Sequence, residues 1–85
     1  MLVQGAVIRE QGVTFAVVVV KSHVVNNSHE AKRAIQNFMP VFRAPVVLMA
    51  QDGNGRPTYY GRRDIADFMA NVPLSAIPWK EYSIN

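Results

Sequence analysis

The sequence predicts a small α/β (α+β) domain in which two helices cover a mixed four-stranded sheet, in the order ββαββα followed by an extended tail. Three observations support this fold class. Residues 13–21 and 46–50 are apolar on both alternating faces, and apolar residues recur at helical spacing in 31–42 and 65–72. Residues 52–55 combine two hairpin dipeptides. With 85 residues, we expect one domain spanning residues 1–85.

The first strand pair begins with residues 2–9, whose imperfect alternation and Gly5 favour a strand near an edge. Residues 10–12 form a turn that Gly12 makes possible. Residues 13–21 are rich in valine on both faces, which predicts a central strand covered on two sides.

The first helix follows a polar connector of residues 22–28. Asn27 or Ser28 can cap it, because each side chain offers an oxygen to free backbone N–H groups. Pro40 should end or kink the helix before Phe42. The residues at helical spacing are expected in the core, and they are Ala31, Ala34, Ile35, Phe38, Met39 and Phe42.

The second half of the chain has the same order of elements, which is strand, turn, strand and helix. Residues 46–50 predict another central strand, Asp52 is expected to accept hydrogen bonds within the turn, and residues 58–60 return as its partner. A helix that includes Phe68 and Met69 then ends at Pro73. Residues 73–85 are expected to be a loosely packed tail, with one turn near 74–77 and an extended end at 79–84 that can form a last edge strand.

The composition excludes several classes of protein. A chain with 49% hydrophobic and 18% charged residues is too apolar to be disordered. Because it has no cysteine, it cannot carry a disulfide framework, a thiolate zinc site or an iron–sulfur cluster. His23 and His29 are fewer ligands than a zinc site needs, and Ser22, Ser28 and Glu30 have no recognised catalytic spacing. We therefore expect no metal, no cofactor and no catalytic residue.

The apolar segments are too short for a membrane protein. The longest run, residues 15–20, is far below the length of a membrane span, and the first residues show no basic region of a secretory signal. We expect a cytoplasmic protein with no membrane partner. Its net charge of +3, without a Lys/Arg tract, permits nucleic acid as a partner without implying it.

Pro45 precedes a short apolar strand, and the Asp52–Gly53 hairpin, Tyr59-Tyr60-Gly61 and a helix opening with Arg63-Asp64 follow. Residues 44–72 thus resemble the C-terminal half of thioredoxin- and glutaredoxin-like domains. The resemblance implies a cis Ala44–Pro45 bond and a substrate-facing groove beside that strand. Because the chain lacks the family's cysteines, thiol–disulfide chemistry is excluded. A ferredoxin-like βαββαβ sandwich, with the tail as its last strand, also fits the order of elements.

Two groups of residues are candidates for binding. The first combines arginines that can hold anions with tyrosines that can stack on bases, and it comprises Arg56, Tyr59, Tyr60, Arg62 and Arg63. Strand alternation places the two tyrosines on opposite faces, which argues against a single stacking platform. The second group is Trp79 and Tyr82, which can dock on a second subunit or back on the parent sheet.

Three functions stay open at this point. The first is a non-catalytic domain that acts through protein–protein contacts as a homodimer, since a chain of this size has little apolar surface to bury alone. The second is a weak nucleic-acid or anion binder that uses Arg43, Arg56, Arg62 and Arg63. The third is a small enzyme with an unrecognised site.

Overall fold

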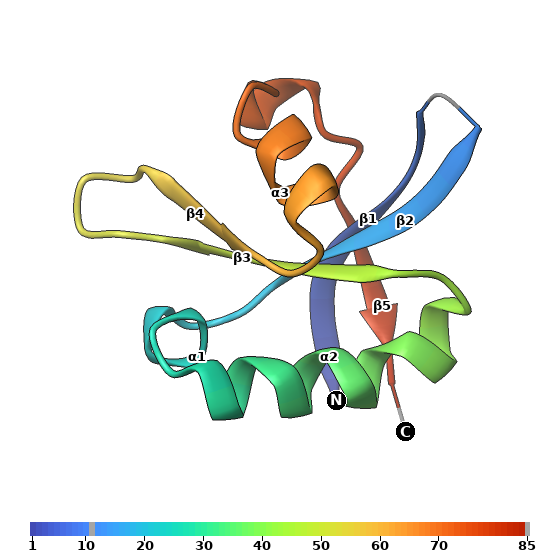
Figure 1. Cartoon of the computed structure of the whole chain (residues 1–85), viewed down its shortest axis with the longest axis horizontal. Coiled ribbons are helices and arrows are strands. Elements are labelled where there is room, and N and C mark those ends of the chain that lie inside the picture. Colours follow the sequence, from blue (N-terminus) through green and yellow to red (C-terminus); the bar gives the residue numbers. More distant parts are fainter. Residues whose placement is uncertain (11, 85) are drawn as a thin grey trace.

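A computed structural model describes residues 1–10 and 12–84, and there it forms a mixed five-stranded sheet with helices on both faces (Figure 1). The strands lie in the order β4-β3-β2-β1-β5. They are β1 (Leu2–Glu10), β2 (Val13–Val19), β3 (Val46–Gln51), β4 (Pro57–Tyr60) and β5 (Lys80–Ser83). The helices are α1 (Ser22–Val25), α2 (Ser28–Phe42) and α3 (Arg63–Met69), with a 3-10 turn η1 (Leu74–Ala76). The predicted α+β class is confirmed.

The two valine-rich strands form the centre of the sheet. β2 and β3 run parallel, with Val17 beside Val47 and Val18 beside Leu48, because the chain crosses between them through α1 and α2. The other neighbouring strands are antiparallel. All four residues of this central register are fully buried. The prediction of two central strands covered on both faces is therefore confirmed, and the two strands are neighbours.

The two main helices lie on opposite faces of the sheet (Figure 1). The α2 face buries Ala16, Val18, Val25, Ala31, Phe38, Val46, Leu48 and Ala50. The α3 face buries Ala6, Phe15, Val17, Val47, Met49, Ile65, Met69 and Ile77. Each layer removes a continuous apolar surface from water, which is the main favourable term in folding.

Helix α2 begins where the sequence predicts and ends later. The Asn27 Oδ1 accepts hydrogen bonds from the backbone N–H groups of His29 and Glu30, both at 3.1 Å, which confirms the cap. Of the two outcomes predicted for Pro40, an end of the helix is wrong, because the helix continues through Phe42. Pro40 lies in the exposed last turn, so water can replace the one backbone bond that it removes. The helix ends at Phe42, and the C-cap residue Arg43 adopts left-handed geometry with φ 54°.

The turn between β3 and β4 is built on Asp52, as predicted. Its Oδ1 accepts hydrogen bonds from the backbone N–H groups of Asn54 at 2.8 Å and Arg56 at 2.9 Å. This turn sends β4 back along β3 in the antiparallel register that ends at Leu48 and Tyr60.

The predicted numbers of strands and helices are wrong. The extended tail supplies a fifth strand, β5, which pairs with residues 2–5 of β1. The connector of residues 22–28 supplies the short helix α1, because Val25 is buried against the α2 face. Both additions depend on contacts between distant parts of the chain.

Two finer expectations also fail. The described residues contain no cis peptide bond, so Ala44–Pro45 is trans. Phe38 and Met69 lie in the core as predicted, but Met39 is 43% exposed and Phe68 is 37% exposed. Helical spacing identifies the face of a helix, whereas the extent of the sheet beneath it decides which of those residues are covered.

Gly5 occupies a crowded position in β1. A Cβ atom there would lie 2.7 Å from the carbonyl oxygen of Val17 and 3.7 Å from two ring carbons of Tyr82. The missing side chain therefore allows β1 to approach β2 closely while the Tyr82 ring lies over the backbone.

Candidate functional site

A groove of about 500 Å³ lies between α2 and the end of β4. We call it the α2–β4 groove. Its lining is apolar on the inside and basic at the rim. It consists of Ile35, Met39, Pro45, Val46, Tyr60 and Gly61, with Lys32 and Arg62 at the rim. A mainly apolar hollow with a few polar groups at its edge is typical of a binding site.

The groove opens because β4 is shorter than β3. The last residue pair of the two strands is Leu48 with Tyr60, so Val46 and Val47 have no partner in β4. The chain then turns at Gly61, whose φ is 154°. A Cβ at this position would lie 3.0 Å from a methyl carbon of Val47 and 3.1 Å from the Val46 carbonyl oxygen. Glycine thus allows a sharp turn without filling the groove.

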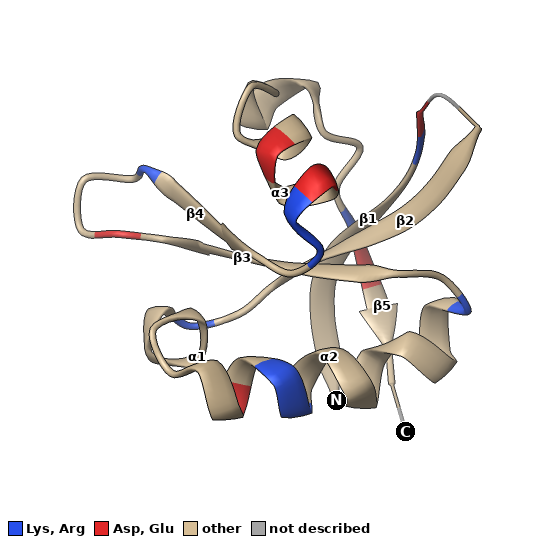
Figure 2. Ribbon diagram, viewed as in Figure 1, with Lys and Arg blue, Asp and Glu red and all other residues tan. Residues whose placement is uncertain are grey.

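The two basic residues at the rim differ in their pairing. The Arg62 guanidinium donates two hydrogen bonds to the Asp64 carboxylate, both at 2.8 Å, and this contact lowers the pKa of Asp64 to about 2. Figure 2 shows this junction of basic and acidic residues at the start of α3. Lys32 is exposed and forms no ion pair within the described residues. Lys32 is therefore the cation that is available to a ligand.

The structure confirms that Tyr59 and Tyr60 lie on opposite faces of the sheet. Tyr60 packs on the α2 face and lines the groove, whereas Tyr59 packs on the α3 face. The Tyr59 hydroxyl is buried and has no hydrogen-bond partner in the described structure. Burial raises the pKa of this phenol. The two rings cannot form one surface for stacking.

Replacing Tyr59 by phenylalanine is expected to raise the free energy of unfolding by about 1 kcal/mol, because it removes a buried hydroxyl that has lost its water without gaining a partner. Urea denaturation of both proteins measures the change. Tyr60→Phe is the matched control and should change stability little. A clear loss of stability in Tyr59→Phe would contradict the unpaired state of the hydroxyl.

Trp79 and Tyr82 both contact other parts of their own domain. The Trp79 indole N–H donates to the Leu74 carbonyl oxygen at 3.2 Å, and its ring packs on the α3 face. Tyr82 lies edge-to-face with Phe42, with 5.0 Å between ring centroids. Both aromatics hold the C-terminal segment on the domain.

The arginines of the predicted anion site come from separate places. Arg56 and Arg62 lie just before and just after β4, while Arg43 ends α2. Arg63 lies 3.9 Å from Asp67. Figure 2 shows that basic and acidic positions are interleaved along the ribbon. A continuous basic surface for a phosphate backbone is not supported by this distribution.

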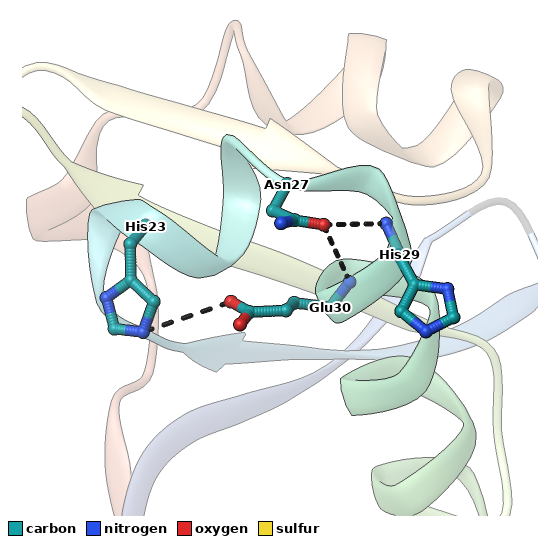
Figure 3. A network of polar contacts seen from close by, with 4 residues as sticks. All are labelled: His23, Asn27, His29 and Glu30. Carbon is teal, nitrogen blue, oxygen red and sulfur yellow. Dashed lines mark hydrogen bonds and ion pairs between the residues drawn. The ribbon is translucent and has the colours of Figure 1, made fainter.

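His23 lies in α1 and His29 lies in the first turn of α2 (Figure 3). His23 Nε2 is 4.0 Å from Glu30 Oε2, and both side chains are exposed. The His29 ring points away from this pair (Figure 3). Within the described residues, no group of three His, Cys, Asp or Glu side chains can hold a metal ion.

The three groove residues on α2 are not candidates on sequence grounds. Ile35 and Met39 were assigned to the core because of their helical spacing, and Lys32 stands out in no motif. A usable signal is the spacing of these residues, since positions 32, 35 and 39 lie on one side of a helix. Nothing in the sequence shows that β4 stops short beside them.

Comparison of the chain with protein families, curated proteins and solved structures finds no match. The resemblance of residues 44–72 to thioredoxin-like domains stays a prediction. No helix in the described part of the chain has both the length and the apolar character needed to cross a membrane.

Proposed function

We propose that this chain is a non-catalytic protein-interaction domain of the cytoplasm. The α2–β4 groove binds a segment of a partner protein that carries apolar side chains next to carboxylates. The observation that carries the proposal is an apolar groove bordered by Lys32, which forms no ion pair in the part of the chain that the structure describes. The groove also lies beside Pro45, where the resemblance to thioredoxin-like domains implies a substrate-facing surface.

The apolar lining supports a partner with apolar side chains. Met39 is 43% exposed, and Ile35 and Tyr60 are half-buried, so each retains surface that a ligand can remove from water. Methionine is flexible and polarisable, which suits a surface that adapts to a partner. The lining offers no pair of a nucleophile and a general base, which favours binding over catalysis.

The charge at the rim supports a carboxylate next to the apolar part of the ligand. Lys32 is free, Arg62 is already neutralised by Asp64, and the chain as a whole has a net charge of +3. A partner carboxylate near Lys32 gains a cation without displacing an internal pair. Nucleic acid is less well supported, because Arg62 and Arg63 lie beside carboxylates and the tyrosines face apart.

Peptides selected from a random display library on the folded chain provide the test. We expect enriched sequences that combine apolar residues with Asp or Glu. The peptides should bind Met39→Asp on the order of tenfold more weakly than the wild type, because a charge in the groove repels carboxylates and loses apolar contact. Fluorescence polarisation of labelled peptides measures the dissociation constants.

Two matched controls separate the groove from general surface effects. Val41 is 44% exposed on the same helix but does not line the groove, so Val41→Asp should bind like the wild type. Lys32→Glu should weaken binding, whereas Arg33→Glu, with the same change in net charge, should not. Equal binding by Met39→Asp and Val41→Asp would exclude this groove as the site.

A further inference from the structure

β1 presents a free edge next to the hairpin that it forms with β2. The strand has nine residues, but β5 pairs only with residues 2–5. Residues 6–10 have β2 on one side and, within the described residues, no strand on the other. Figure 1 shows the β1–β2 hairpin projecting past the beginning of β5 and away from its arrowhead. Pro78 lies just before β5 and has no N–H group with which to extend the ladder.

An apolar groove accompanies this free edge. It has a volume of about 270 Å³ and lies between residues 7–10 of β1 and the segment that runs from α3 to Pro78. Val7 is 45% exposed and Phe68 is 37% exposed. Unpaired backbone groups beside exposed apolar side chains form a template for an added strand.

We propose that a second copy of this chain pairs with this edge, with β1 antiparallel to β1 across a two-fold axis at Ile8. Directly opposite residues of an antiparallel pair point to the same face of the sheet. A two-fold axis perpendicular to the sheet must therefore lie between one residue and the same residue of the copy. At Ile8 it places the two isoleucines together, Val7 opposite Arg9 and Ala6 opposite Glu10. At Arg9 it would oppose two like charges, which is unfavourable. An axis at Val7 would place Arg9 opposite Gly5, whose outer edge β5 already occupies. The register at Ile8 avoids both conflicts.

A second copy fits this edge better than another partner. In the register at Ile8, Arg9 and Glu10 lie opposite the uncharged residues Val7 and Ala6 of the copy, so a second chain can pair here without opposing like charges. The outer strands are protected against such pairing, because β4 begins with Pro57 and β5 carries Lys80 and Glu81. The α2–β4 groove lies at the β4 end of the strand order, so the dimer and the peptide site are tested separately.

Sedimentation equilibrium of the full chain, from micromolar to millimolar concentration, tests self-association. We expect a reversible dimer in the wild type and in Val41→Lys. Val7→Lys and Phe68→Glu should weaken association on the order of tenfold or more, because each places a charge in the interface. Circular dichroism checks that the variants remain folded. A wild type that is monomeric throughout, or a dimer that both variants preserve, would overturn the proposal.

Cysteine cross-linking tests the register, since the chain has no cysteine of its own. Residues directly opposite each other in an antiparallel pair approach closely enough for a disulfide. Ile8→Cys should therefore form a covalent dimer on mild oxidation on the order of tenfold faster than Thr14→Cys, which lies on β2 away from the axis. Equal rates for the two variants would exclude the two-fold axis at Ile8.

Discussion

Replacing Val18 by aspartate is expected to abolish the folded state. Val18 is fully buried, lies between Gly5 of β1 and Leu48 of β3, and faces α2. A carboxylate there would have no cation among the apolar side chains of the α2 face. Burial of an unpaired charge costs several kcal/mol, while a domain of this size has roughly 4–13 kcal/mol of stability in total. Circular dichroism should show loss of native structure at room temperature.

Thr14→Asp is the matched control for this prediction. Thr14 is on the same strand and the same face of the sheet, but it is exposed and opposite Arg9. The same charge should be tolerated at that position, since water and a neighbouring cation solvate it. A native circular-dichroism spectrum for Val18→Asp would show that β2 is not buried on both faces.

Replacing Gly5 by alanine is expected to destabilise the domain by about 3 kcal/mol, although the change adds only one methyl group. The new Cβ would lie 2.7 Å from the Val17 carbonyl oxygen, a contact that real structures do not contain. Because this oxygen belongs to the backbone of β2, relief requires the two strands to separate or shift. Urea denaturation measures the loss in the free energy of unfolding.

Gly53→Ala isolates the effect of crowding from the general effect of replacing glycine. An added Cβ at Gly53 meets nothing within 4 Å. We expect its stability to remain within about 0.5 kcal/mol of the wild type. If Gly5→Ala matched this control, the close approach of β1 to β2 would be wrong.

Much of the fold could be predicted because local patterns and tertiary structure agree. The valines of β2 point to both faces of the strand. Only a strand in the middle of a sheet that is covered on both sides can remove both sets from water. Asn27 and Asp52 act through hydrogen bonds to residues two to four positions away, which sequence alone can indicate. Strand β5 was open as an alternative for the extended tail, and the sequence alone could not decide it because β5 pairs with β1, at the far end of the chain.

The candidate site was predictable only in part. Tyr60 and Arg62 stand out by composition and do line the groove. Their neighbours Lys32 and Met39 come from α2, much earlier in the chain, and only the packing of α2 beside the end of β4 brings them together. Arg56 and Tyr59 share the same segment as Tyr60, but the alternation and length of β4 direct them elsewhere.

The parallel pairing of β2 with β3 has a consequence for how the chain folds. The β1–β2 and β3–β4 hairpins each close a short loop, so they can form early and independently. The pairing of Ala16 with Val46 closes a much longer loop. The conformational entropy of that loop is lost before the contacts between the two strands can compensate for it. We therefore expect the slow step of refolding to be the docking of two preformed hairpins, with the crossover helix laid across them.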